Sequence, residues 1–297
     1  MVVVKLRQRN PENVEEWIEK ELYLDGYLKS NLDIGVDLLR KKFDQVWFID
    51  GSEGAGKTNL GITCAYFVSP EERRHTLLTR VCTKIEQADK TILNAQPFDS
   101  IVIDEGYGGM SSTGFMTKVN RLLQRRFTEI RAKFLFVFLI APSFMDINRY
   151  FAIWRSRCLL HVYLKGDERG RAAFFNYDKK KILYVIGRKK VYNYSCVTPN
   201  FIFRHTYQME KLIDIKAYDR KKTLSNLEAT KRELSEPEIK KKIYKEMIEN
   251  RKKFGLTVTN EQLAQLIGKS RRTIQSYIAE ISKEINRENE DGNSYII

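Results

Sequence analysis

Eight consecutive residues are the clearest candidates for chemistry in this sequence. They are Gly51, Ser52, Glu53, Gly54, Ala55, Gly56, Lys57 and Thr58, and they fit the pattern G-x-x-x-x-G-K-[ST] without a mismatch. Glycines let consecutive backbone N–H groups turn toward phosphate oxygens, and a helix beginning near Gly56 would direct its positive N-terminal end at the same charge. We therefore expect this 51–58 loop to bind the phosphates of ATP, with Lys57 on the β- and γ-phosphates and Thr58 as a ligand of Mg²⁺. A glycine-rich turn without function is the alternative, and it leaves the Lys57-Thr58 pair unexplained.

A second apolar run ends in two acidic residues. Residues 100–103 predict a buried strand, and Asp104 and Glu105 follow it directly. In a nucleotide-hydrolysing site, Asp104 would hold Mg²⁺, and Glu105 would orient and activate the attacking water. Either acid alone would be typical of a solvated strand end. Many small-molecule kinases lack a carboxylate at the second position, so Glu105 favours hydrolysis.

Further candidates follow a third apolar run. Residues 134–140 show no polar alternation, which predicts a central parallel strand covered on both faces. Ser143 comes next and is a candidate sensor of the γ-phosphate, with a helix N-cap as the alternative. Arg155 and Arg157 are candidates for an arginine finger, acting in cis or from a neighbouring subunit, and Arg149 is a third choice. Ordinary exposed salt-bridge arginines are the alternative for all three.

Several other elements must position these residues. Residues 1–45 are predicted to be mostly helical, because Val14, Trp17, Ile18 and Leu22 fit one helix face and residues 32–43 repeat the spacing. We also expect a strand at 46–50 before the 51–58 loop, an amphipathic helix after it, a short strand near 76–78, and helices at 84–93 and 146–154.

A β-hairpin is predicted from residues 171–177 and 181–186, which carry alternate aromatic residues. Its tip and flank are basic: Lys179, Lys180, Lys181, Arg188, Lys189 and Lys190. Aromatic and basic residues together suit nucleic-acid contact. A plain hairpin core with a solvated basic edge is the favoured alternative.

The composition bounds the class of protein. With 297 residues, 42% of them hydrophobic, the chain can form one large and one small domain. Lys and Arg number 52 against 38 Asp and Glu, a net charge of +14 with a pI near 9.5, which favours DNA as a partner over a merely soluble basic surface. Four separated cysteines and three histidines do not have zinc-site spacing, and no run approaches the ~20 apolar residues of a membrane span. We expect a cytoplasmic protein without a membrane segment.

The C-terminal part has the spacing of a helix-turn-helix. Residues 211–236 are basic with little apolar patterning and are predicted to be a linker. Within 237–287, Thr259 and Gln262 form a capping-box start and Gly268 suits the turn. The outward residues of the second helix would then contact DNA: Arg271, Arg272, Gln275 and Ser276. A three-helix protein-contact module is the alternative, and residues 288–297 are predicted to be a flexible tail.

Four segments resemble one group of P-loop ATPases, found in archaeal viruses, integrated elements and plasmids. The segments are Asn31-Leu32-Asp33, Ile49-Asp50-Gly51-Ser52-Glu53-Gly54-Ala55-Gly56-Lys57, Ile103-Asp104-Glu105-Gly106-Tyr107-Gly108-Gly109 and Trp154-Arg155-Ser156-Arg157. That group looks related to the zonular-occludens-toxin-like and FtsK–HerA-like DNA-pumping ATPases. The resemblance covers roughly residues 25–210 and implies a RecA-like sheet with strand order 5-1-4-3-2, often in a ring of subunits. One departure is Thr113-Gly114, where the resemblance leads us to expect an arginine.

Together these observations predict an α/β chain. Its 46–210 core would be a RecA-like, additional-strand P-loop NTPase with a mainly parallel sheet, followed by a small all-α helix-turn-helix domain. The expected function is that of an ATP- and Mg²⁺-dependent, DNA-binding motor-type ATPase of a mobile genetic element, which translocates, packages or transfers DNA. A nucleotide kinase, with Asn148-Arg149-Tyr150 as its Asp-Arg-aromatic motif, is one rival. An ATP-switched DNA-binding regulator or partitioning protein is the other.

Overall fold

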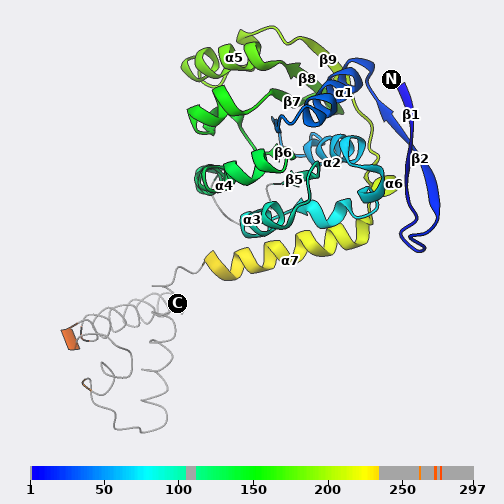
Figure 1. Cartoon of the computed structure of the whole chain (residues 1–297). Coiled ribbons are helices and arrows are strands. Elements are labelled where there is room, and N and C mark those ends of the chain that lie inside the picture. The colour runs from blue at the N-terminus through cyan, green and yellow to red at the C-terminus, as the bar shows by residue number, and fades with distance from the viewer. Residues whose placement is uncertain (1, 105–111, 234–260, 262–270, 273–274, 276–297) are drawn as a thin grey trace, which may run out of the picture. The chain divides into compact units, whose positions relative to one another are not determined.

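Seven strands form one sheet in the spatial order β4-β5-β6-β3-β7-β8-β9 (Figure 1). In that order they are β4 (Val81–Cys82), β5 (Ser100–Ile103), β6 (Phe136–Ile140), β3 (Gln45–Gly51), β7 (Cys158–Lys165), β8 (Glu168–Phe175) and β9 (Phe201–Arg204). The first five strands in this order, β4, β5, β6, β3 and β7, pair in parallel. Strands β8 and β9 extend the sheet with antiparallel pairing. Numbered along the chain from β3, the parallel strands have the order 5-1-4-3-2. The fold is therefore mixed α/β with a mostly parallel sheet, as predicted, and is compatible with a RecA-like fold.

The computed structural model describes residues 2–104, 112–233, 261, 271, 272 and 275, with backbone alone at 112–116, 118 and 225–233. The chain divides into two units, Met1–Ala229 and Thr230–Ile297. The α-helices are α1 (Gly26–Arg40), α2 (Lys57–Val68), α3 (Ile85–Asn94), α4 (Ser112–Ala132), α5 (Tyr177–Lys189), α6 (Met209–Leu212) and α7 (Ile215–Glu233). The short helical turns are η1 (Glu71–Arg73), η2 (Leu77–Arg80), η3 (Phe144–Asp146), η4 (Phe151–Arg155) and η5 (Tyr194–Cys196).

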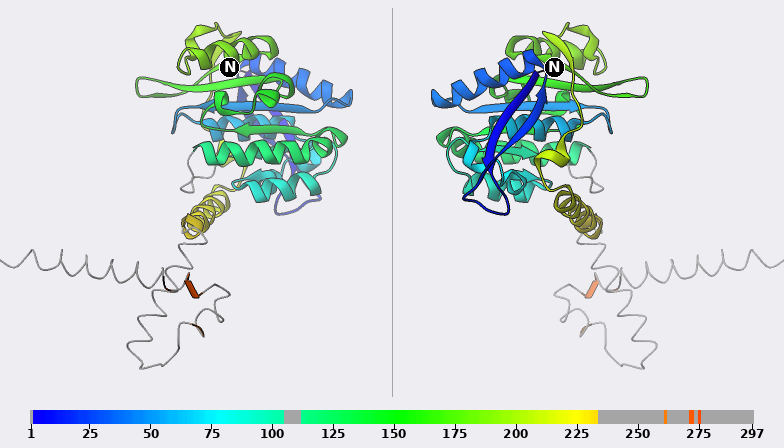
Figure 2. Two further views of the ribbon diagram at one scale, coloured as in Figure 1. Left: turned by 90° about the vertical axis from the view of Figure 1, so that its left-hand side faces the viewer. Right: turned by 90° about the vertical axis from the view of Figure 1, so that its right-hand side faces the viewer.

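Both faces of the parallel sheet are covered, which explains why its strands lack polar alternation. Along β3, Trp47 and Ile49 pack with α1 and α2 on one face, whereas Val46 and Phe48 pack with α3, α4 and α5 on the other. Side views show these helices lying on opposite sides of the strands (Figure 2). The sheet is the centre of two apolar layers, and its strand ends are where side chains can meet a ligand.

The N-terminal segment is only partly helical: α1 overlaps the helix predicted within 32–43, whereas the residues before it are strands. Strands β1 (Val2–Arg9) and β2 (Trp17–Leu24) form a separate antiparallel hairpin. The spacing of Ile18 and Leu22 that suggested a helix also fits a strand, in which Leu22 and Leu24 share the buried face. The hairpin packs on α2, where the Tyr66 hydroxyl donates to Gln8 Oε1 at 2.8 Å.

The predicted hairpin is also displaced. Strand β8 pairs with β7 through a turn at Gly166, and residues 181–186 belong to helix α5. The Asn176 side chain caps this helix by accepting from the backbone N–H of Lys179 at 3.0 Å. Part of the predicted basic flank is used in packing, because the buried Lys180 ammonium donates to the carbonyl oxygens of Ala152 and Ile153.

Three smaller predictions also differ from the structure. The short strand expected near 76–78 lies at Val81–Cys82, after η2. In place of the single helix expected at 146–154, the structure has two short helical turns, η3 and η4. The basic segment at 211–236 begins as packed structure, not as a linker, because Leu212, Ile213 and Tyr218 join the core. The sequence did not predict this packing, because the few apolar residues among the many charged ones show no helical or strand periodicity.

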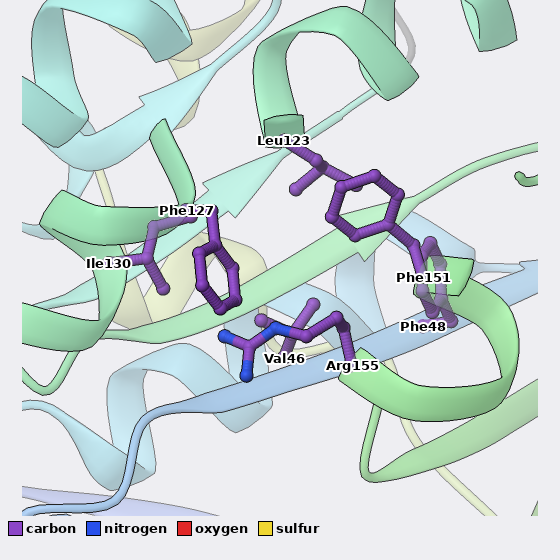
Figure 3. A pocket seen from close by; sticks show the side chains of 7 residues that line it. All are labelled: Val46, Phe48, Leu123, Phe127, Ile130, Phe151 and Arg155. Carbon is purple, nitrogen blue, oxygen red and sulfur yellow. The ribbon is translucent and has the colours of Figure 1, made fainter. Parts of the chain in front are cut away.

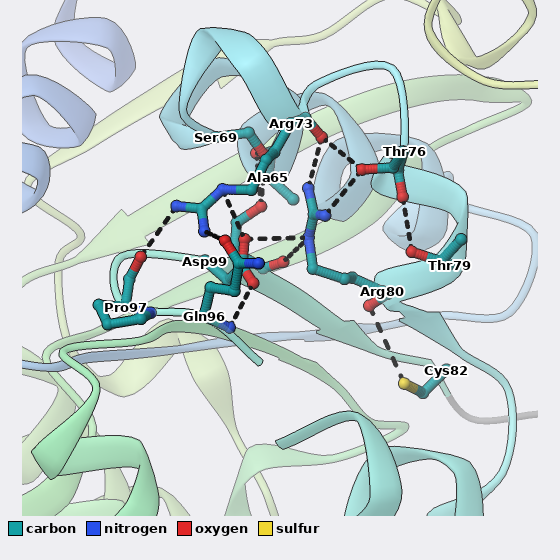
Figure 4. A network of polar contacts seen from close by, with 11 residues as sticks. Ala65, Ser69, Arg73, Thr76, Thr79, Arg80, Cys82, Gln96, Pro97 and Asp99 are labelled. Carbon is teal, nitrogen blue, oxygen red and sulfur yellow. Dashed lines mark hydrogen bonds and ion pairs between the residues drawn. The ribbon is translucent and has the colours of Figure 1, made fainter. Parts of the chain in front are cut away.

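A buried polar network fixes the start of β5, at the opposite end from Asp104. The Asp99 carboxylate lies 3.3 Å from Arg73 Nε and 3.6 Å from Arg80 Nε, and it accepts from the backbone N–H of Gln96 at 2.8 Å (Figure 4). Arg80 also donates to the Ser100 carbonyl oxygen at 3.1 Å. These contacts set the position of the strand that carries Asp104.

Candidate functional site

The 51–58 loop has a backbone that only glycine accommodates at two positions. Gly51 ends β3 with φ 126°, and a Cβ there would lie 1.7 Å from the Val162 carbonyl oxygen of the neighbouring strand. Gly56 caps α2 with φ 102°, and its Cβ would lie 2.9 Å from His205 Cε1. The motif glycines are therefore explained by positive φ and close approach.

Lys57 begins α2 and turns its side chain back into the loop. Its ammonium donates to the carbonyl oxygens of Gly51 at 2.7 Å and Ser52 at 3.0 Å. The positive charge therefore lies within the curve of the backbone, where the N-terminal dipole of α2 also favours an anion.

Thr58 and Asp104 meet across the strand ends. The Thr58 hydroxyl donates to Asp104 Oδ2 at 2.9 Å, and the Asp104 backbone N–H donates to the Cys82 carbonyl oxygen at 2.8 Å. Burial raises the pKa of Asp104, while the charge of Lys222 and the hydroxyl donors act to lower this pKa. The structure thus brings together Lys57, Thr58 and Asp104, which the sequence had proposed as one site.

This donor set fits a magnesium nucleotide. Mg²⁺ prefers oxygen ligands, keeps several waters, and takes few ligands from the protein when substrate phosphates are present. Thr58 and Asp104 offer a hydroxyl and a carboxylate next to a loop that holds the Lys57 ammonium and three glycines with positive φ. Among residues 2–104 and 112–233, no group of three or more His, Cys, Asp or Glu side chains could hold a metal by itself. Glu105, the predicted water-activating base, lies outside the described residues.

A second buried carboxylate, which the sequence analysis overlooked, lies immediately before the loop. Asp50 Oδ2 accepts from the backbone N–H of Phe144 at 2.8 Å and from the Tyr194 hydroxyl, and Asp50 Oδ1 lies 2.8 Å from His161 Nδ1. The rings of His161 and Tyr194 stack with centroids 3.8 Å apart. A charged residue directly after the apolar run 46–49 was the available signal. The network joins the end of β3 to the segment that follows β6.

Ser143 lies in that segment and has a structural role. Its hydroxyl accepts from the Met145 backbone N–H at 3.2 Å and caps η3. The N-cap interpretation is therefore realised in the structure, while the role as a γ-phosphate sensor stays a prediction.

The antiparallel end of the sheet supports the loop from the side. The backbone N–H of Gly170 donates to the Ala55 carbonyl oxygen at 3.3 Å, and the backbone N–H of His205 donates to the Gly170 carbonyl oxygen at 2.7 Å. The Asn59 amide donates to the Thr206 carbonyl oxygen at 2.7 Å. Burial lowers the pKa of His205 to about 4, so this imidazole is neutral near pH 7. No local motif identified residues 170 and 205, because their contacts depend on the tertiary fold.

The candidate arginines lie at the opposite edge of the sheet. The Arg157 backbone N–H donates to the Val46 carbonyl oxygen at 2.9 Å, at the start of β3, whereas the 51–58 loop follows the end of that strand. Arg155 Nη2 lies 2.7 Å from Asp44 Oδ2, and the guanidinium lies 3.7 Å from the Phe127 ring centroid (Figure 3). The structure therefore does not bring Arg155 or Arg157 to the loop of their own chain. Arg149 is exposed beyond η3. A finger acting on a neighbouring subunit stays a prediction.

A small apolar pocket surrounds Arg155 and is separate from the 51–58 loop. It is lined by Val46, Phe48, Leu123, Phe127, Ile130, Phe151 and Arg155 (Figure 3). The ion pair with Asp44 satisfies the charge that enters this apolar layer.

The described residues of the second unit are few. Arg271, Arg272 and Gln275 are exposed, and Arg271 Nη1 forms an ion pair with Glu261 Oε1 at 2.6 Å. Ser276 and the rest of the predicted helix-turn-helix lie outside the described residues. Their DNA-binding role stays a prediction.

Comparisons with known proteins give a limited result. No protein-family model matches the chain, and no curated protein matches it. Among solved structures, the chain is similar to the crystal structure of the N-terminal domain of zonular occludens toxin from Neisseria meningitidis, with 13% sequence identity and a TM-score of 0.31. That match covers 60% of this chain and 98% of the other. Within the described part of the chain, no helix combines the length and apolar character needed to cross a bilayer.

Proposed function

We propose that this chain binds ATP with Mg²⁺ at the 51–58 loop and hydrolyses it, and that it uses this activity as a DNA-binding, motor-type ATPase of a mobile genetic element. The observation that carries the nucleotide site is the 2.9 Å contact between Thr58 Oγ1 and Asp104 Oδ2, beside the Lys57 ammonium. Lys57, Thr58 and Asp104 supply an ammonium, a hydroxyl and a carboxylate at the C-terminal ends of parallel strands, where open α/β sheets bind ligands.

Each residue has a distinct part in the proposed reaction. The backbone N–H groups of residues 51–58 and Lys57 would hold the phosphates, and Thr58 with Asp104 would hold Mg²⁺, which supplies charge neutralisation at the transferring phosphoryl group. Glu105 would orient water and accept its proton. The neutral His205 and the Asn59 contacts keep the loop and the start of α2 in place without adding charge.

Separate substitutions test binding and hydrolysis. Lys57→Ala should abolish binding of a fluorescent ATP analogue, whereas Glu105→Gln should keep binding and lose steady-state hydrolysis by about 10²-fold or more. Glu12→Gln, on an exposed turn, is the matched control and should change neither. Unchanged hydrolysis in Glu105→Gln would contradict the mechanism. Labelled γ-phosphate on a nucleoside monophosphate would indicate the kinase class instead.

DNA binding is supported by the net charge of +14 and by the C-terminal sequence. Arg272 is the sharper probe, because Arg271 already pairs with Glu261. Arg272→Ala should weaken duplex binding by about 1–3 kcal/mol and relax sequence preference at the contacted base, since one base contact is lost. Arg40→Ala, an exposed arginine at the end of α1, is the control. Equal duplex affinity for Arg272→Ala and the wild type would remove Arg272 from the DNA contact.

A motor predicts that DNA changes ATP turnover and that subunits assemble. The direct measurement is the hydrolysis rate with and without duplex or single-stranded DNA, together with the mass in solution with a non-hydrolysable analogue. Strong preference for one DNA sequence, with turnover indifferent to DNA, would favour an ATP-switched regulator.

A further inference from the structure

Helix α7 reaches the candidate metal site through Tyr218. The Tyr218 hydroxyl donates to Asp104 Oδ2 at 3.0 Å, and both residues are only 4% exposed. The same carboxylate oxygen also accepts from Thr58.

The first turns of α7 are held against the sheet edge. The Lys221 ammonium donates to the carbonyl oxygens of Leu78, at 3.3 Å, and Val81. Asp214 begins the helix by accepting from the backbone N–H of Ala217 at 3.0 Å. Val81 lies in β4, next to β5, which Asp104 directly follows. Tyr218 therefore contacts Asp104 from a helix that is fixed on the adjacent strand.

Two hydroxyl donors occupy one carboxylate oxygen. A carboxylate oxygen has about two lone-pair positions, and Thr58 and Tyr218 use both at Oδ2. A cation that binds Asp104 through Oδ2, the oxygen beside Thr58 Oγ1, has to take one of these two positions. The Thr58 oxygen can face the cation while its hydrogen still points at Asp104, so Tyr218 is the donor in competition.

We infer that Tyr218 is a latch: its hydroxyl ties α7 to Asp104, and binding of a Mg²⁺ nucleotide at Asp104 Oδ2 opens this contact. The inference rests on the proposed nucleotide site. Helix α7 runs from Ile215 to Glu233 and so continues past Ala229, where the first unit ends. Because coupling is reciprocal, an event that draws α7 away from Asp104 strengthens Mg²⁺ binding by the same factor as Mg²⁺ loosens α7. The latch thereby links nucleotide occupancy to helix α7, whose last described residues, 230–233, belong to the second unit.

The first test is the Mg²⁺ dependence of nucleotide binding. In Tyr218→Phe, the Mg²⁺ concentration that half-saturates binding of a fluorescent ATP analogue should fall about three- to tenfold, the equivalent of one hydrogen bond. Tyr27→Phe, which alters a tyrosine that is 70% exposed on α1, should leave that concentration unchanged. An unchanged or higher value in Tyr218→Phe overturns the latch.

The second test does not depend on nucleotide affinity. Backbone amide exchange over residues 215–222 should be faster in metal-free Tyr218→Phe than in the metal-free wild type. Mg²⁺ with the non-hydrolysable analogue should speed exchange in the wild type and add little in the variant. Slower exchange on adding Mg²⁺ and analogue to the wild type would overturn the inference, because the contact would then tighten on binding.

The two levels of proposal fail differently. If the wild type binds no nucleotide at any Mg²⁺ concentration, the proposed function is wrong and the latch falls with it. If Lys57-dependent binding is present but the half-saturating Mg²⁺ concentration is the same in Tyr218→Phe, only the latch is wrong.

Discussion

The Asp50 carboxylate accepts a hydrogen bond from the backbone N–H of Phe144 at 2.8 Å, between the end of β3 and the turn that follows β6. Asp50 is 1% exposed, so its hydrogen bonds replace the contacts with water that burial removes. The contact fixes the spacing of the two central strand ends on which the 51–58 loop and Ser143 lie.

Asp50→Asn should destabilise the protein by about 1–3 kcal/mol, because the amide replaces an accepting oxygen with a donor among groups that already donate. The measurement is the urea midpoint of unfolding. Asp33→Asn, at a surface pair with Lys29, should shift the midpoint little. Equal shifts in the two variants would show that the Asp50 network contributes nothing specific.

The two loop glycines Gly51 and Gly54 offer a matched comparison, because both have positive φ but only one is crowded. Gly51→Ala would place its Cβ 1.7 Å from a backbone oxygen, whereas Gly54→Ala, at φ 71°, has no atom within 4 Å. Gly54→Ala should cost about 1–2 kcal/mol from backbone strain alone. Gly51→Ala should be far more destabilising, to the point of little folded protein. Thermal unfolding and soluble yield check the order, and similar stability of the two variants would contradict the close approach of β7.

The Arg155–Asp44 ion pair should stabilise the apolar layer around it. Arg155→Met leaves a buried carboxylate unpaired and should cost about 3 kcal/mol, part of which Asp44→Asn should restore in the double variant. Arg40→Met, in an exposed pair with Asp37, should cost under about 1 kcal/mol.

Additive losses in the Arg155–Asp44 cycle would mean that the two charges do not interact. Arg155→Lys keeps the charge but loses the planar contact with Phe127. If this variant folds stably yet hydrolyses ATP slowly, the predicted finger in a neighbouring subunit gains support.

Lys180 should make stability depend on pH. Burial lowers its pKa from 10.5 to about 7 in the folded protein. Between these values the unfolded chain binds a proton that the folded chain does not, so the Lys180 contribution to the free energy of unfolding increases as pH rises from about 7 to 10 and is smallest below pH 7.

Subtracting the unfolding free energy of Lys180→Met from that of the wild type separates the contribution of Lys180 from those of other groups that titrate in the same pH range. The difference in unfolding free energy should rise with pH at no more than about 1.4 kcal/mol per pH unit. Lys189→Met, at an exposed position of α5, should give a flat difference. A flat curve for Lys180→Met would show that Lys180 has an ordinary pKa.

The central sheet and the core of the site were predictable because their signals are local. The apolar runs before Gly51 and Asp104 and after Phe134 each mark a strand buried on both faces. The spacing of Gly51, Lys57 and Thr58 identifies a loop whose glycines the structure explains individually.

The remaining elements depend on tertiary contacts that leave little trace in sequence. Ile18 and Leu22 fit a helix and a strand equally well, and pairing with β1 decides between them. Lys180 belongs to a basic run yet is fully buried, because two carbonyl oxygens lie within its reach. Tyr218 stands among charges with no apolar period, and only the folded chain shows that it reaches Asp104.

Helix α7 also changes where the catalytic part of the chain should be considered to end. A fragment cut at residue 210, the boundary drawn from the sequence, would lose Leu212, Ile213 and Tyr218, all of which are buried in the core. Such a fragment would expose apolar surface and uncover Asp104 at once. A fragment ending near residue 229, where the first unit ends, keeps these three residues and the contact with Asp104, so its Mg²⁺ response could be compared with that of the whole protein.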